Sequence, residues 1–279
     1  MGAPMSMDAE SIKEVARLCR IEIVKMTYRA QAGHPGGSLS EIDILSALYS
    51  GVLRVNPENP DWEDRDRFIL SKGHASPGMY VILALKGFIT MDDLHSYRVK
   101  GGVCQGHVDM KWCPGVDFSA GSLGMGLSFG MGCAIAAKLD GSERRAFVMI
   151  GDGEIQEGSI WEAAMAATHH ELGNLKVILD RNRIQNDDFC SEQMRMFDIP
   201  AKWQSFGWNV KEIDGHNMAE ILDGLKFLED ENSGPSILIA NTVKGKGVSY
   251  MEDNPAFHGA APNDEQYAIA MKELGEVIS

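Results

Sequence analysis

Residues 148–185 read VMIGDGEIQEGSIWEAAMAATHHELGNLKVILDRNRIQ, and this stretch decides the fold. A short apolar strand over 146–150 ends in the turn Gly-Asp-Gly at 151–153. Glycine tolerates positive φ and lets a ligand approach the backbone, so this turn ends the strand sharply. A helix with an alanine-rich apolar face over 157–170 and a second buried strand over 175–179 complete a βαβ unit.

Polar residues follow both strands of this unit at the point where each strand ends. Asp152 follows the first strand and Asn182 follows the second. Ligands of open parallel sheets bind at the carboxyl ends of the strands. Carboxylate and amide oxygens are the ligands that Mg²⁺ or Ca²⁺ prefers, and the N-terminus of the following helix attracts anions. Either turn alone is an ordinary surface turn, but the pair at this spacing favours a site for a cation and a phosphate.

Composition limits the kind of protein. A chain of 279 residues is long enough for one large α/β domain, and we expect residues 1–279 to form a single domain. The net charge of −14 argues against binding to nucleic acid or to an anionic membrane. The five cysteines contain no C-x-x-C pair and fit free thiols in a reducing compartment. No apolar run reaches transmembrane length and no signal-peptide core opens the chain, so a cytoplasmic location is expected.

Strands alternate with helices along the rest of the chain. This alternation predicts an α/β fold with a doubly wound, mostly parallel sheet and helices on both faces. Further strands are expected over 68–70, 209–213 and 236–242. Further helices are expected over 8–30, 77–86 and 123–139, from Ser40, from Ile199, after Asn217 and at the end of the chain.

Of two glycine-rich segments, the first is predicted to form a loop and the second a helix. Residues 31–38 are predicted to be a loop, followed by a helix that begins at Ser40, with Asp43 in a pattern that resembles a capping box. The predicted helix 123–139 contains four glycines, and each interior glycine costs roughly 0.5–1 kcal/mol relative to alanine. Large apolar residues between these glycines argue against a flexible linker. We therefore expect this helix to be approached closely by another backbone or a ligand, and to pack at an interface.

Four histidines lie in glycine-flanked loops, namely His34, His74, His107 and His258. Histidine transfers protons and donates hydrogen bonds to oxyanions near neutral pH. Any one of these histidines alone is more often a structural loop residue. Four of them at predicted strand or helix ends favour a shared polar site. Their spacing contains no H-x-x-x-H pair, which disfavours zinc.

Together these motifs resemble one family, the transketolases, over nearly the whole chain. The resemblance is to the N-terminal half of the family, which binds thiamine diphosphate. It rests on AGHPGG at 32–37, LSKGHA at 70–75, GHVD at 106–109, PGVDFSAGSLGMGLS at 114–128, GDGEIQEGSIWEA at 151–163 and FHGAAP at 257–262. One departure is Arg181, because the cofactor motif normally has two successive asparagines and only Asn182 matches.

The resemblance implies thiamine diphosphate and Mg²⁺ as cofactors, with Ca²⁺ as a possible substitute. The metal would be held by Asp152, Asn182 and the backbone carbonyl of Ile184. The candidate catalytic residues that would face the sugar are His34, His107 and His258. The cofactor would be contacted by His74, Gly121, Ser122, Leu123, Gly151, Gly153, Glu154, Glu157, Lys244 and His258. Lys72 is a further candidate for a charge beside the phosphates, and Glu157 and Glu162 would lie at a subunit contact.

The resemblance also implies that two domains of the family, the pyrimidine-binding and C-terminal domains, are absent from this chain. In the family the cofactor lies between this domain and the pyrimidine-binding domain of another copy, which supplies the glutamate that activates the aminopyrimidine. We therefore expect the N-terminal subunit of a split transketolase, which would be active with a separate C-terminal subunit in a homodimer of heterodimers. It would transfer a two-carbon ketol unit between sugars or sugar phosphates. The alternatives are a non-catalytic cofactor-binding or regulatory module, or a subunit of another thiamine diphosphate enzyme that acts on a specialised sugar.

Overall fold

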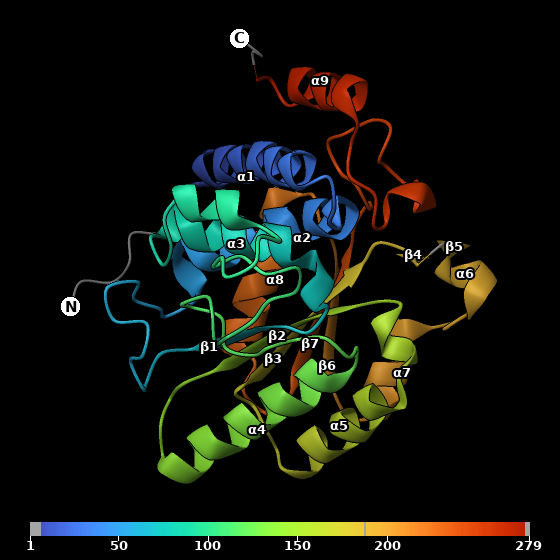
Figure 1. The fold of residues 1–279 in the computed structure, drawn as a ribbon. Coiled ribbons are helices and arrows are strands. Elements are labelled where there is room, and N and C mark those ends of the chain that lie inside the picture. The colour runs from blue at the N-terminus through green and yellow to red at the C-terminus, as the bar shows by residue number, and fades with distance from the viewer. Residues whose placement is uncertain (1–6, 187, 277–279) are drawn as a thin grey trace.

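The computed structural model describes residues 7–186 and 188–276 (Figure 1). A five-stranded sheet has the order β1-β2-β3-β7-β6, and every neighbouring pair of strands is parallel. The strands are β1 (Arg67–Leu70), β2 (Ala146–Gly151), β3 (Leu175–Arg181), β6 (Asn209–Asp214) and β7 (Ser236–Asn241). A small antiparallel pair, β4 (Ile184–Gln185) with β5 (Asp188–Phe189), follows β3. The predicted parallel sheet is confirmed, and every predicted strand is present, with ends that differ by two residues at most.

Helices cover both faces of the sheet (Figure 1). One face is covered by α1 (Ala9–Ala30), α2 (Pro35–Ala47), α3 (Ser76–Lys86) and α8 (Met218–Asp230). The other face is covered by α4 (Met125–Asp140), α5 (Gly158–His169) and α7 (Ile199–Ser205). The shorter helices are α6 (Cys190–Gln193), α9 (Asp264–Glu273), a π-helical turn over Leu48–Val52, and 3₁₀ turns at Gly73–Ala75, Asp92–Ser96, Glu154–Gln156 and Pro255–Phe257. None of these described helices is long and apolar enough to cross a membrane.

The strands are apolar runs because both of their faces are buried. Along β2, Phe147 and Met149 point into the core beneath α1, α2, α3 and α8. Val148 and Ile150 point into the second core, beneath α4, α5 and α7. Successive side chains of a strand lie on opposite faces, so a sheet between two helical layers needs apolar residues at every position.

The start of α2 corrects the sequence prediction. The helix begins at Pro35, and all of its residues are buried, so residues 35–38 are helical although they were predicted to be a loop. Proline is suited to the first helical position because its φ is already helical and its missing N–H would have no partner there. Ser40 therefore lies inside the helix. Asp43 does not cap it, because the Asp43 carboxylate forms a buried ion pair with Arg20.

The glycines of α4 are explained by the sheet beneath the helix. A Cβ atom at Gly130 would collide with the Val148 side chain of β2, and one at Gly126 would collide with Ser71. The expected close approach is therefore present, but the neighbour is this chain's own sheet. Gly132 has open space where its Cβ would lie. The expectation that α4 also packs against another subunit remains a prediction.

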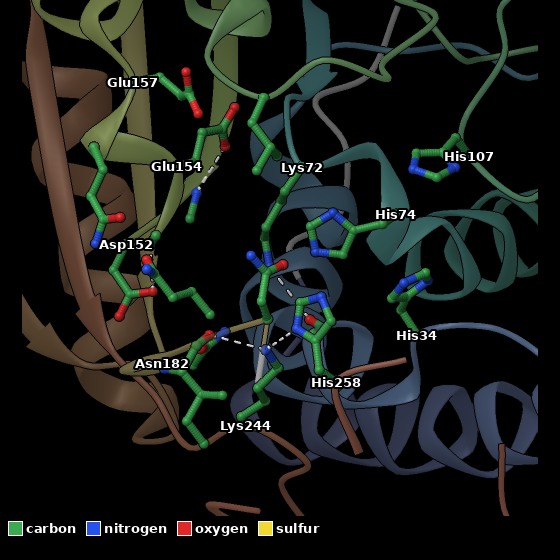
Figure 2. Close-up of a pocket in the computed structure, with 18 of the residues that line it drawn as sticks. His34, Lys72, His74, His107, Asp152, Glu154, Glu157, Asn182, Lys244 and His258 are labelled. Atoms are coloured by element: carbon green, nitrogen blue, oxygen red, sulfur yellow. Dashed lines mark hydrogen bonds between the residues drawn. The ribbon is translucent and has the colours of Figure 1, made fainter. Parts of the chain in front are cut away.

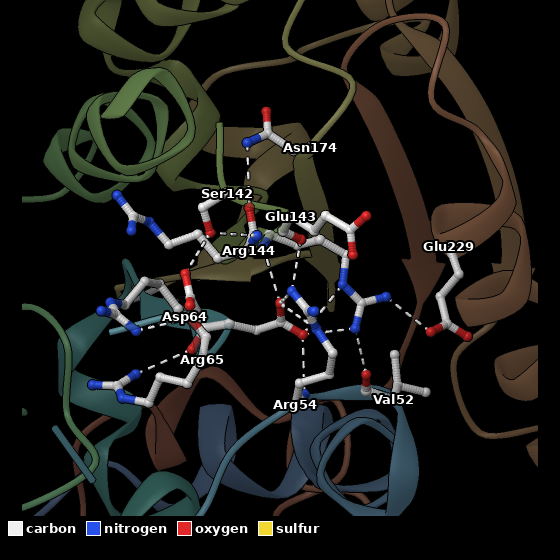
Figure 3. A network of polar contacts seen from close by, with 12 residues as sticks. Val52, Arg54, Asp64, Arg65, Ser142, Glu143, Arg144, Asn174 and Glu229 are labelled. Carbon is white, nitrogen blue, oxygen red and sulfur yellow. Dashed lines mark hydrogen bonds and ion pairs between the residues drawn. The ribbon is translucent and has the colours of Figure 1, made fainter. Parts of the chain in front are cut away.

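The amino ends of the strands are held by a polar network (Figure 3). Asp66 is fully buried and accepts hydrogen bonds from Arg54 and Arg145. Burial alone would raise the pKa of Asp66, but its hydrogen bonds with Arg145 and Arg54 keep that pKa below its usual value. Arg145 also pairs with Glu229 at 2.8 Å. This end of the sheet is occupied by structural ion pairs, whereas the carboxyl ends of the strands border a cavity.

We predict opposite effects for two alanine substitutions in α4. Gly130→Ala should lower the free energy of unfolding by about 1–3 kcal/mol, because the new methyl group overpacks the contact with β2. Gly132→Ala should raise it by about 0.5–1 kcal/mol, because it removes a flexible residue from the helix without a collision. Urea denaturation of the isolated chain measures both. Equal effects of the two substitutions would contradict this account of the helix.

Candidate functional site

A cavity of about 350 Å³ lies at the carboxyl ends of β1, β2, β3 and β7 (Figure 2). Because these strands are parallel, the residues that follow them meet at one edge of the sheet. The residues that line the cavity are His34, Gly37, Lys72, His74, His107, Gly121, Leu123, Gly151, Asp152, Gly153, Glu154, Gln156, Glu157, Asn182, Ile184, Gln185, Asn186, Lys244 and His258.

The cavity brings together nearly all of the residues that the sequence singled out. Of the predicted metal, cofactor and sugar residues, Ser122 alone is not part of the lining, and it is exposed beside Gly121. Glu162 is also exposed and lies on α5, away from the lining. The lining residues that were not predicted are Gly37, Gln156, Gln185 and Asn186. The individual roles of all these residues remain predictions.

The four histidines form one cluster although they come from four separate segments. The His34 ring lies 5.2 Å from His74, 5.4 Å from His258 and 6.3 Å from His107, measured between ring centroids. His34 directly precedes α2, and His74 lies in the turn after β1. The His34 Nδ1 atom is buried and has no hydrogen-bond partner among the described residues. Its hydrogen-bonding capacity is therefore unsatisfied within the described part of the chain.

The histidine rings are neutral at pH 7. Burial, and then nearby positive charge, lower the pKa of His34 to about 4 and that of His258 to about 3. The same causes lower the pKa values of His74 and His107. A neutral imidazole has one N–H donor and one acceptor nitrogen, so the cluster can both donate to and accept from sugar hydroxyl groups.

Lys244 is buried between the histidine cluster and β4. Its Nζ atom donates to the Ile184 carbonyl at 3.0 Å and lies 2.6 Å from the His258 Nδ1. Burial lowers the pKa of Lys244 to about 8, although the nearby Asp152 carboxylate opposes this shift. A Cβ atom on Gly36 would lie 3.2 Å from the Lys244 Cγ, so the glycine at the start of α2 makes room for this side chain.

The oxygen atoms at the other side of the cavity fit a hard cation. Asp152 is buried and accepts hydrogen bonds from the backbone N–H groups of Arg183 and Gly153, at 2.6 and 2.9 Å. Burial, and then the Asp180 charge, raise the pKa of Asp152 to about 6. A cation would compensate this poorly solvated carboxylate. Asn182 lines the same cavity and supplies an amide oxygen.

The predicted metal ligands are all oxygen atoms, which are hard donors. Carboxylate, amide and carbonyl oxygens are the ligands of Mg²⁺ and Ca²⁺. Over residues 7–186 and 188–276, no group of three or more His, Cys, Asp or Glu side chains is arranged to hold a metal ion. Asp152 and Asn182 offer oxygen donors of this kind to the cavity, and Asp152, Asn182 and the Ile184 carbonyl remain the predicted ligands of a cation.

A buried charge network beneath the cavity was missed by sequence reasoning. The Lys72 ammonium lies 2.6 Å from Glu41 and 2.5 Å from Asp180. Burial raises the pKa of Glu41 to about 8, whereas the Lys72 charge outweighs burial and keeps the Asp180 carboxyl ionised, with a pKa below its usual value. Lys72 lines the cavity, but its charge is paired. In the sequence, the one indication of this network was Asp180, a charged residue near the end of the apolar strand β3.

Glu154 holds the turn at 151–153 rather than facing solvent. It is buried and accepts hydrogen bonds from the backbone N–H groups of Gly124 and Gly151, and from the Ser71 hydroxyl. These bonds join the ends of β1 and β2 to the start of α4. A Cβ atom on Gly153 would collide with Gln185, so the turn requires glycine at this position.

The fold and the site together define a class of α/β proteins that bind a phosphate-bearing cofactor at the carboxyl edge of a parallel sheet. Residues 10–277 match the family described as transketolase, thiamine diphosphate binding domain. The chain therefore belongs to the transketolase family of transferases, as its motifs suggested.

Two relatives have nearly the same length as this chain. The chain is 41% identical over 272 residues to an apulose-4-phosphate transketolase subunit of Phocaeicola vulgatus, covering 98% of this chain and 96% of that protein. It is 37% identical over 270 residues to the 6-deoxy-6-sulfo-D-fructose transketolase subunit SqwG of a Clostridium species, covering 97% of this chain and 98% of that protein. Human transketolase is 34% identical over 257 residues, but the match covers 41% of that protein.

Solved transketolases share the fold. The transketolase of Campylobacter jejuni superimposes with a TM-score of 0.92 at 31% identity, covering 97% of this chain and 43% of that one. The enzyme of Leishmania mexicana gives a TM-score of 0.90 at 30% identity, covering 95% of this chain and 41% of that one. The chain thus spans less than half of these transketolases.

We predict that His34 makes the fold sensitive to acid. Its pKa is about 4 in the folded chain and 6.5 as an ordinary histidine, so the folded state favours the neutral ring. The stability that depends on this neutral ring is complete above pH 6.5 and is lost as the pH falls from 6.5 to 4. Replacing His34 by glutamine should therefore reduce the loss of unfolding free energy over this range by about 1–2 kcal/mol.

The measurement is urea denaturation at intervals between pH 7.5 and 4.5. The matched control is His95→Gln, which replaces an exposed histidine outside the cavity. A pH dependence that is the same in His34→Gln and in the unmodified chain would contradict the buried neutral ring.

Proposed function

We propose that this chain is the N-terminal subunit of a split transketolase. With thiamine diphosphate and Mg²⁺ it would transfer a two-carbon ketol unit from a ketose donor to an aldose acceptor. The observation that carries the proposal is the single cavity that contains both an oxygen donor set for a cation and four neutral histidines. A non-catalytic cofactor-binding or regulatory module would need the oxygen donors but not the four histidines.

The cofactor, when bound, would supply the carbanion stabilisation that transfer of a two-carbon unit requires. The chain's own residues would bind and orient it. Asp152, Asn182 and the Ile184 carbonyl would hold the metal that neutralises the diphosphate. Ca²⁺ would substitute for Mg²⁺, because both take oxygen ligands.

His258 would act as a hydrogen-bond donor to the sugar. The Lys244 ammonium can only donate, so the His258 Nδ1 that it contacts must be the acceptor nitrogen. The ring proton is then on Nε2. His34 and His107 would complete the contacts to the sugar hydroxyl groups, because neutral histidine rings both give and take protons.

A separate C-terminal subunit would complete the site. Support comes from the relatives of equal length, which are named as transketolase subunits. Residues 1–279 would form the cofactor-binding domain, and the partner would supply the pyrimidine-binding and C-terminal domains with the activating glutamate. The assembly would be a homodimer of heterodimers in the cytoplasm. The relatives are named for a sugar phosphate and a sulfonated sugar, which favours a specialised sugar substrate here.

The direct test is ketol transfer by this chain with thiamine diphosphate and Mg²⁺, alone and with a C-terminal transketolase subunit. We expect activity only with the partner. In that complex His258→Ala should lower kcat by about 100-fold or more, which is the usual contribution of a positioned proton donor. The matched control, His95→Ala, should leave kcat unchanged. Transfer by this chain alone would refute the split enzyme, and full activity of His258→Ala would remove His258 from the chemistry.

The metal assignment has its own test in the complex. Thiamine diphosphate with Mg²⁺ should stabilise the folded complex, by about 2.7 kcal/mol at 100 times its Kd. A chelator should abolish this stabilisation. Asp152→Asn should abolish it as well, because the amide oxygen lacks the negative charge with which the carboxylate attracts the cation. Thermal denaturation measures the effect, with Asp61→Asn as an exposed control. An unchanged cofactor-induced shift in Asp152→Asn would show that the cation is held elsewhere.

A further inference from the structure

We propose that His216, which is not among the residues that line the cavity, is a positioning residue that holds Lys244 at its place in the cavity wall. His216 follows β6, and one hydrogen bond from its ring reaches the segment after β7. The effect of His216 on catalysis rests on the proposed function, whereas the hydrogen bonds that produce the effect do not.

The segment that carries Lys244 does not fix the place of this side chain by itself. The next residue, Gly245, has φ 81°, and glycine has little conformational preference of its own. The Lys244 ammonium is buried, and it contacts the Ile184 carbonyl and the neutral His258 ring, neither of which carries a charge (Figure 2). Burial lowers the pKa of Lys244 more than the Asp152 carboxylate raises it. An ammonium in this position would gain solvation by leaving the cavity, so other contacts must hold its backbone.

The His216 ring supplies such a contact beside Lys244. The Val243 N–H donates to the His216 Nε2 atom at 2.9 Å. Because an N–H group can only donate, Nε2 is the acceptor nitrogen and the ring proton is on Nδ1. That proton is donated to the Asp43 carboxylate, whose Oδ2 atom lies 2.7 Å from Nδ1. The ring therefore joins Asp43 of α2 to the residue before Lys244, and both of its nitrogen atoms are used.

Asp43 is a firm anchor for this ring. It is buried and accepts two hydrogen bonds from the Arg20 guanidinium of α1, at 2.9 and 2.6 Å. Burial alone would raise the pKa of Asp43, but its hydrogen bonds with His216 and Arg20 keep that pKa below its usual value. The Arg20 Nε atom also donates to the Lys246 carbonyl at 3.0 Å. The same carboxylate thus orients two side chains that bind the backbone on either side of Lys244.

The connection reaches the proposed chemistry through His258. The Lys244 Nζ lies 2.6 Å from the His258 Nδ1, and this contact keeps the ring proton on Nε2, the proposed donor to the sugar. Without the bond between His216 and Val243, the backbone beside Lys244 would lose one of its attachments. The ammonium would then withdraw from the cavity, and the His258 Nδ1 would lose its donor. His216 therefore acts through Lys244 and needs no contact with the sugar.

Two substitutions separate the two hydrogen bonds of the His216 ring. The amide of asparagine reaches the place of Nδ1, and the amide of glutamine reaches the place of Nε2. His216→Asn therefore keeps the donor to Asp43 and loses the acceptor for Val243, whereas His216→Gln keeps the acceptor and loses the donor. The bond to the carboxylate is charge-assisted and is the stronger of the two. In urea denaturation, His216→Gln should therefore lower the midpoint at least as much as His216→Asn.

Activity should follow the opposite order. In the complex with the C-terminal subunit, thiamine diphosphate and Mg²⁺, His216→Asn should lower kcat at least about tenfold, since a misplacement of about 1 Å can cost about 100-fold. His216→Gln should lower kcat by less than about threefold, because it keeps the bond to Val243. In a Lys244→Met background, His216→Asn should cause no further loss, because a residue that acts through another is not additive with it.

The exposed residue His95 gives the matched controls, since His95→Asn and His95→Gln should leave kcat unchanged. A loss of kcat that follows the loss of stability, and is therefore larger in His216→Gln, would assign His216 a structural role and overturn the proposal. An equal loss from His216→Asn with and without Lys244 would also overturn it, because His216 would then act independently of Lys244.

The same connection is measured without catalysis, by NMR of the full chain. Hydrogen exchange of the Val243 N–H should be at least about tenfold faster in His216→Asn than in His216→Gln or the unmodified chain. The ¹⁵N resonance of the His258 Nδ1 should shift in His216→Asn and in Lys244→Met, but not in His216→Gln. These changes without ketol transfer by any form would support the role of His216 and refute the proposed function. An unchanged His258 resonance in His216→Asn would refute the role of His216 whether or not the complex is active.

Discussion

The buried ion pair between Lys72 and Asp180 is the interaction on which the site depends. Lys72 follows β1 and Asp180 lies near the end of β3, so the pair joins two strand ends beneath the cavity. Asp180 also accepts hydrogen bonds from Ser40 of α2, from the Thr242 hydroxyl after β7, and from the Asn182 amide. Burying charges is expensive unless their hydrogen-bonding capacity is satisfied, and removing one partner of such a pair costs about 3–5 kcal/mol. Four segments are therefore held together by one carboxylate.

This network determines which groups face the ligand. The opposite charges of Lys72 and Asp180 compensate each other beneath the cavity. Burial raises the pKa of Glu41 to about 8, which keeps this carboxyl protonated near neutral pH. The cavity then presents neutral histidine rings on one side and oxygen atoms on the other. Asp180 accepts a hydrogen bond from the Asn182 Nδ2 atom, which fixes the orientation of the amide, and the amide oxygen accepts one from the Ile184 backbone N–H at 3.2 Å. A cation at Asp152 would compensate the remaining buried carboxylate that lines the cavity.

The sequence predicted the elements that depend on local pattern. The strands were visible because both of their faces are buried, and the candidate residues Asp152 and Asn182 were visible because strand ends meet at one edge. The start of α2 was not predictable, because Gly36 lies close to the Phe257 carbonyl and the Lys244 side chain, which are far away in the chain. Asp180 was missed for a related reason. A charged residue in sequence resembles a surface residue until its partners are known.

The two sides of the cavity are built from different kinds of structure. The side with Asp152 and Asn182 uses residues that directly follow strands, whose positions are fixed by the hydrogen bonds of the sheet. The histidine side uses His107 from the irregular segment between α3 and α4, and His258 from a loop near the end of the chain. Loops tolerate substitutions and insertions that strands do not. Under the proposed function, substitutions in these loops would change the sugar that is recognised and preserve the geometry beside Asp152 and Asn182, because the buried network beneath the strand ends does not include the loops that carry His107 and His258.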